Sequence, residues 1–64
     1  MKCNGVAYPL ASPLPLLQFL QEQGYDRSVI VVEKNGRILK DQELEEEVLL
    51  AQDVLEVVSF VGGG

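Results

Sequence analysis

The sequence has little of what most metal sites and nucleophilic active sites are built from. It contains no histidine, no tryptophan and one cysteine, Cys3. A single thiol can form no internal disulfide, and a zinc site would lack its usual nitrogen and sulfur ligands. Because no histidine or basic cluster accompanies Cys3, we interpret it as a small apolar residue rather than a nucleophile. The hydrophobic core must therefore stabilise the chain unaided.

Basic residues are also scarce, with five Lys and Arg against ten Asp and Glu and a formal net charge of -5. Neutralising a phosphate backbone needs clustered Lys and Arg, so we expect no nucleic-acid partner. The longest apolar run is far short of the roughly 20 residues that a membrane helix requires, and no signal-peptide pattern opens the sequence. We therefore expect no membrane association and a cytoplasmic location.

The length of 64 residues and the 47% content of hydrophobic residues indicate one small folded domain. An enclosed active site would consume most of the core that such a chain can build. The length therefore argues against an autonomous enzyme.

The first third of the chain carries turn and helix signals. Asn4-Gly5 is a strong signal for a tight hairpin, which predicts short paired strands over residues 1–3 and 6–10. Ser12-Pro13 is typical of a helix start, and Gly24 is typical of a helix end. Apolar residues between them recur at helical spacing, which predicts one helix of about three turns with Leu16, Leu17, Phe19 and Leu20 on its buried side.

The rest of the chain favours strands. The β-branched run 29–32 predicts a strand, which the Asn35-Gly36 turn connects to a shorter strand over residues 37–39. Residues 41–47 carry five carboxylates and predict a solvated connection with at most one helical turn. Residues 48–50 fit a brief edge strand or part of that turn. Gln52-Asp53 predicts a turn before the strongest strand, residues 54–61.

The last strand has a two-residue period, which separates its side chains into two faces. Glu56 marks the face open to solvent, so Val58 and Phe60 are expected there, together with two side chains of the run 29–32. Exposed apolar patches on a sheet are typical of partner surfaces, although a small protein also exposes apolar groups because it cannot bury them all. We interpret Val58 and Phe60 as docking residues.

The sequence closes on Gly62-Gly63-Gly64, which offers no side chain to the core. A frayed end or a cloning remnant would explain these glycines, but a reactive terminal carboxylate explains them better. Three glycines span at most about 10 Å and can enter a narrow active site of another protein. A free carboxylate must first be activated, for example as an acyl-adenylate, and the chain has no nucleotide-binding motif. The pattern indicates a carrier or a protein tag that a separate enzyme activates.

These residues resemble, over essentially the whole chain, the ThiS family of ubiquitin-like sulfur carrier proteins of thiamin biosynthesis. The resemblance rests on the Asn4-Gly5 hairpin, the apolar helix, the stretch 29–36, and above all residues 53–64. It implies an α+β β-grasp fold, in which a mixed four- to five-stranded sheet wraps one helix, with residues 1–61 as the domain and 62–64 as a flexible tail. The turn before the last strand departs from the family, which often has Gly-Asp where this chain has Gln52-Asp53.

The resemblance also implies a function and its partners. An adenylyltransferase of the E1-like class would use ATP and magnesium to adenylate the carboxylate of Gly64, with no cofactor bound by the carrier itself. Sulfur from a donor such as a cysteine desulfurase would convert it to a thiocarboxylate, and thiazole synthase would receive that sulfur. Gly62 and Gly63 would occupy the partner's channel, and Val58, Phe60 and Val61 would dock near its mouth.

Three alternatives stay open on the sequence. The small subunit of molybdopterin synthase resembles the same family in fold and tail but is generally a longer chain. A ubiquitin-like modifier would join its tail to lysines of target proteins. A plain β-grasp interaction module would have an inert tail.

Overall fold

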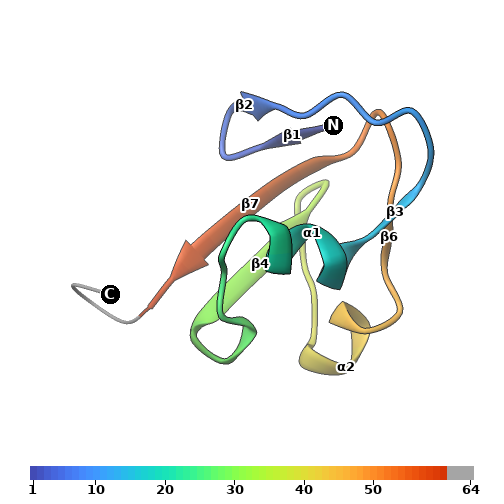
Figure 1. Ribbon diagram of the computed structural model, residues 1–64. Coiled ribbons are helices and arrows are strands. Elements are labelled where there is room, and N and C mark those ends of the chain that lie inside the picture. Colours follow the sequence, from blue (N-terminus) through green and yellow to red (C-terminus); the bar gives the residue numbers. More distant parts are fainter. Residues whose placement is uncertain (61–64) are drawn as a thin grey trace.

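Five strands form the main sheet of the computed structural model, which describes residues 1–60 (Figure 1). Their spatial order is β2-β1-β7-β4-β5, so the last strand of the chain lies in the centre. Strand β1 runs parallel to β7, and the other neighbouring pairs are antiparallel. The mixed four- to five-stranded sheet that the family resemblance implied is confirmed, with five strands. The strands are β1 Lys2–Cys3, β2 Val6–Ala7, β4 Ile30–Lys34, β5 Arg37–Ile38 and β7 Val54–Ser59.

Helix α1, Leu16–Glu22, packs against one face of this sheet (Figure 1). Gly24 follows it with a φ of 79°, the left-handed conformation that ends helices, so the predicted helix end is confirmed. The predicted start at Ser12-Pro13 is wrong, and the helix is shorter than three turns. Pro13 and Pro15 each disfavour helical backbone in the preceding residue, so Ser12 and Leu14 stay outside the helix.

The segment before α1 is a strand instead. Strand β3, Leu14–Pro15, pairs with β6, Val48–Leu49, in a separate two-stranded antiparallel sheet. Residues 48–50 therefore do contribute a strand, but not to the edge of the main sheet. The polar stretch 41–47 contains one helical turn, α2, Asp41–Leu44, and a 3₁₀ turn, η1, covers Arg27–Val29. Within residues 1–60, no helix has the length and apolar character to cross a membrane.

The core lies between α1 and the sheet, with β6 and α2 closing its side. Tyr8 covers one end, its ring edge-to-face with Phe19 at a centroid distance of 5.1 Å. Strand β7 contributes Leu55 and Val57 to this core, and Val54, Glu56 and Val58 point the other way, as the two-residue period predicts. The buried hydrophobic residues are Met1, Cys3, Leu16, Phe19, Leu20, Ile30, Val32, Leu39, Leu44, Leu49, Leu55 and Val57.

Both Asn-Gly turns also bind the central strand. Asn4, with a φ of 52°, accepts a hydrogen bond from the Val57 N–H through Oδ1 at 2.8 Å and donates to the Val57 carbonyl through Nδ2 at 3.1 Å. Asn35, with a φ of 53°, accepts from the Val54 N–H through Oδ1 at 2.9 Å and donates its backbone N–H to the Val54 carbonyl at 2.8 Å. Each amide extends the hydrogen bonding of β7 beyond a neighbouring strand. We call these contacts the asparagine clamps.

A buried acidic residue secures the start of β7. The Asp53 side chain accepts hydrogen bonds from Asn35 Nδ2 at 3.0 Å and from the Leu50 N–H at 2.8 Å, and Lys34 Nζ lies 3.4 Å from its Oδ2. Lys34 also binds Glu47 Oε1 at 2.7 Å. Burial raises the pKa of Asp53, but these hydrogen bonds and the Lys34 charge outweigh burial and hold it below its usual value.

Removing either asparagine clamp should destabilise the fold. Asn4→Gly and Asn35→Gly keep the positive φ accessible but lose the side-chain hydrogen bonds, so we expect each to lower the unfolding free energy by about 1–2 kcal/mol. Urea unfolding measures this. Ser12→Gly, at an exposed bend, is the control for the added glycine. Clamp variants as stable as that control would contradict the role of the asparagines.

Asp53 should make the fold sensitive to acid. A carboxyl whose pKa is lower in the folded state stabilises the fold above its unfolded pKa of about 3.9, and this stabilisation is lost as the pH falls through the folded pKa. Asp53→Asn should therefore have a lower unfolding free energy than wild type at pH 7. This difference in unfolding free energy, the stability gap, should narrow below about pH 4. Urea unfolding of both proteins at pH 7 and below about pH 4 measures the stability gap. A constant gap would show that the charge of Asp53 does not contribute.

Candidate functional site

The end of the central strand is the structural feature that leads to the predicted functional residues. Ile30 pairs with Ser59, and the Phe60 N–H donates to the Val29 carbonyl at 3.0 Å, so backbone pairing continues through residue 60. The β7 arrowhead lies at the end of the molecule away from the N-terminus (Figure 1). Val58 and Phe60 belong to this end. The other predicted site residues, Val61, Gly62, Gly63 and Gly64, lie outside the described residues.

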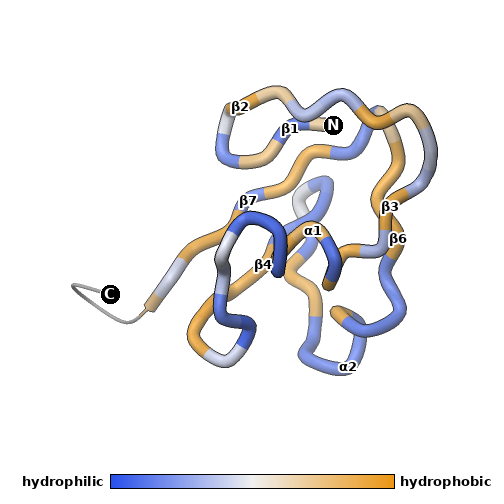
Figure 2. Tube along the Cα trace, in the orientation of Figure 1, coloured by the Kyte–Doolittle hydropathy of each residue, from blue (hydrophilic) through white to orange (hydrophobic). Residues whose placement is uncertain are grey.

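The open face of the sheet near this end is largely apolar. Val58 is 60% exposed and Phe60 63% exposed. Val31, 40% exposed, lies directly opposite Val58 on β4. Figure 2 shows hydrophobic character along most of β4 and β7, with a hydrophilic interruption in β7. The exposed positions of Val58 and Phe60 follow the predicted alternation, while their docking role stays a prediction.

The expectation that two side chains of the run 29–32 face this side is wrong. Ile30 and Val32 are buried, and Val29 packs partly against the core. Val29 belongs to the η1 turn that precedes β4, so it does not share the alternation of the strand. Val31 is the one member of the run on the open face.

Two carboxylates and one further apolar side chain extend this face. Glu33 on β4 lies directly opposite Glu56 on β7, and Ile38 on β5 lies opposite Glu33. Ile38 is 63% exposed. The sequence identified Glu56 as a marker of the open face but missed Glu33 and Ile38. Their alternation was present in the sequence, but their placement depends on strand pairing between distant segments.

Within residues 1–60, we find neither a reactive thiol nor a metal-binding cluster that would suggest a different functional site. Burial, and secondarily the Glu56 charge, raises the pKa of Cys3, which favours an unreactive thiol. Within residues 1–60, no group of three or more His, Cys, Asp or Glu side chains is placed to bind a metal ion.

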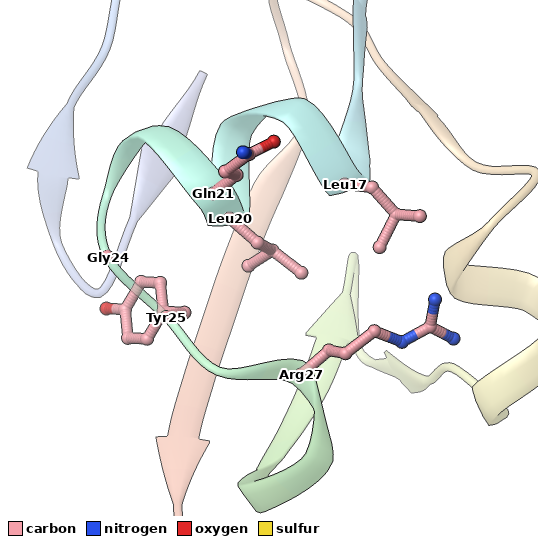
Figure 3. Close-up of a pocket in the computed structure, with 6 residues that line it drawn as sticks. All are labelled: Leu17, Leu20, Gln21, Gly24, Tyr25 and Arg27. Atoms are coloured by element: carbon pink, nitrogen blue, oxygen red, sulfur yellow. The ribbon is translucent and has the colours of Figure 1, made fainter.

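A shallow pocket lies beside the C-terminal end of α1 (Figure 3). The guanidinium of Arg27, one of its lining residues, lies 3.3 Å from both Asp41 and Glu45, so internal ion pairs already engage its charge. Neither Val58 nor Phe60, the two predicted site residues that the structure describes, lines this pocket. Its lining consists of Leu17, Leu20, Gln21, Gly24, Tyr25 and Arg27.

Comparison with known proteins assigns the fold and the family. Over 98% of its length, the chain superposes on 96% of the crystal structure of the thiamine biosynthesis protein ThiS from Geobacter metallireducens, with a TM-score of 0.78 and 23% identity. That likeness shows the β-grasp fold that the sequence predicted.

Sequence similarity assigns the family as well as the fold. The chain is 38% identical over 39 residues to the sulfur carrier protein ThiS of Bacillus subtilis (strain 168), a match that covers 61% of this chain and spans 59% of that relative's length. The model of the ThiS family matches residues 1–64, the glycine end included. The chain therefore belongs to the ThiS family.

Proposed function

We propose that this protein is a sulfur carrier rather than an enzyme, and that its reactive group is the terminal carboxylate of Gly64. The observation that carries the proposal is the family match over residues 1–64, which includes Gly62, Gly63 and Gly64. The name of the Bacillus subtilis relative, sulfur carrier protein, supports the same role. The central position of β7 adds a physical reason, because the glycines come only three positions after the end of a strand that is paired on both sides.

The chemistry requires two steps on the Gly64 carboxylate, which a separate adenylyltransferase of the E1-like class would catalyse with ATP and magnesium. In the first step, a carboxylate oxygen attacks the α-phosphate of ATP and pyrophosphate leaves. In the second, a sulfur nucleophile attacks the acyl carbon, a C–S bond forms and AMP leaves. If a cysteine desulfurase supplies the sulfur as a persulfide, a thiol must reduce the resulting acyl disulfide to the thiocarboxylate.

The thiocarboxylate would then donate its sulfur to thiazole synthase, for formation of the thiazole ring of thiamin. Glycines at 62 and 63 suit a narrow channel because they carry no side chains. Val58 and Phe60, exposed at the end of β7, supply an apolar surface beside the point where the chain would enter that channel. Val61 is the next residue along the chain and completes the proposed docking segment.

Deleting Gly63 and Gly64 should abolish adenylation and leave folding unchanged, because neither residue contributes a side chain to the core. Two measurements are needed, ATP–pyrophosphate exchange with the adenylyltransferase and thermal unfolding of the free carrier. Intact mass of wild type from thiamin-producing cells should show replacement of one oxygen by sulfur at Gly64. A truncated carrier that still supports thiazole formation would refute the proposed reactive group.

Replacing the docking side chains should weaken activation without weakening the fold. Val58→Ser and Phe60→Ser each remove an exposed apolar side chain, so we expect KM for the carrier in adenylation to rise by about tenfold at unchanged unfolding temperature. Val6→Ser is the matched control, because Val6 is 54% exposed but lies on the outer strand β2. If Val6→Ser raises KM equally, the apolar surface at the end of β7 is not the docking site.

A further inference from the structure

Two like charges face each other in the middle of the open face. Glu33 and Glu56 are directly opposite residues of the antiparallel pair β4 and β7. Opposite residues of such a pair have Cβ atoms roughly 4.5–5.5 Å apart, and like-charged side chains at directly opposite positions destabilise a sheet. We call Glu33 and Glu56 the carboxylate pair.

Three of the five Lys and Arg side chains form ion pairs elsewhere in the protein. Arg27 lies within ion-pair distance of Asp41 and Glu45, Lys34 of Glu47 and Asp53, and Arg37 of Glu43. Among residues 1–60, no Lys or Arg nitrogen lies within 4 Å of a carboxylate oxygen of Glu33 or Glu56, and Lys2, opposite Val54 on the neighbouring strand, is no exception. Within residues 1–60, the carboxylate pair therefore has no ion-pair partner.

Apolar side chains flank the carboxylate pair on the same face. Val31 and Val58 form the adjoining cross-strand pair on that face, and Ile38 lies opposite Glu33. Phe60 follows at the end of β7. A protein that covered these apolar groups would also remove water from the two carboxylates. Such burial is costly unless the covering surface supplies a positive charge.

We propose that the adenylyltransferase places an arginine side chain between Glu33 and Glu56 while its apolar residues cover Val31, Val58 and Phe60. A guanidinium fits best because it is planar and carries several donors, so it can bind two carboxylates at once. A second copy of this chain does not fit, because two such faces would bring four carboxylates together. This inference rests on the proposed function and extends the docking surface from the end of β7 to β4 and β5.

The proposal predicts opposite effects on folding and on binding. Glu33→Gln/Glu56→Gln removes the repulsion, so the free carrier should be at least as stable as wild type. The same variant should lose the arginine contact, so KM for the carrier in adenylation should rise by about tenfold or more. A merely structural role of the two residues would not separate these effects.

The matched control is Glu22→Gln/Glu46→Gln. Glu22 and Glu46 are exposed, Glu22 at the end of α1 and Glu46 after α2. Each double variant removes two of the ten acidic residues and changes the formal net charge from -5 to -3. The control should therefore reproduce any effect of net charge alone. ATP–pyrophosphate exchange at 50 and 300 mM salt should show a steeper rise of KM with salt for wild type than for Glu33→Gln/Glu56→Gln.

Equal KM values for the two double variants, with equal salt dependence, would overturn the arginine contact and leave the sulfur-carrier function intact. If the wild-type chain is not adenylated at all, the proposed function itself fails. A rise in KM confined to Glu33→Gln/Glu56→Gln, without loss of stability, would support the proposal.

Discussion

The structure depends on the hydrogen bonding of strand β7 to both of its neighbours. This strand pairs with β1 on one side and β4 on the other, and the asparagine clamps extend the pairing at Val54 and Val57. It also contributes Leu55 and Val57 to the core. A domain of this size has few kcal/mol of stability to spare, so its central strand cannot detach without loss of the fold. The residues that follow are consequently attached to the most constrained part of the molecule.

That attachment links the fold to the proposed chemistry. A carrier must present its terminal carboxylate at a defined distance from the surface that its partner recognises. Val58 and Phe60 lie at the end of β7, a few residues before Gly64 in the sequence, so the proposed docking residues and the proposed reactive carboxylate are close along the chain. The apolar side chains alternate along that strand between core and open face. One segment therefore stabilises the domain with one set of side chains and leaves the other set exposed, where we propose that a partner docks.

Local signals in the sequence predicted much of this architecture. The β-branched run before Glu33 and the alternation from Val54 onward predicted two central strands, and Gly24 predicted the helix end. The prediction of the helix start was wrong because Ser12-Pro13 is an ambiguous signal. The second proline, Pro15, disfavours helical backbone at Leu14, and pairing with Leu49 then makes this segment a strand. That partner lies 35 positions later in the chain, so no local pattern could reveal it.

In the candidate site, too, some features follow from local sequence patterns and others only from pairing between distant strands. Exposure of Val58 and Phe60 follows from alternation alone, whereas the opposition of Glu33 and Glu56 exists only once β4 and β7 are in register. A slip of one residue would place Glu33 in the core, so the hydrophobic pattern that buries Val32 and Val57 also fixes the carboxylate pair. The repulsion between the two charges costs at most about 1 kcal/mol, on the scale of cross-strand pairs. The core that sets the register can tolerate this cost, so the open face can carry the two charges that we propose a partner recognises.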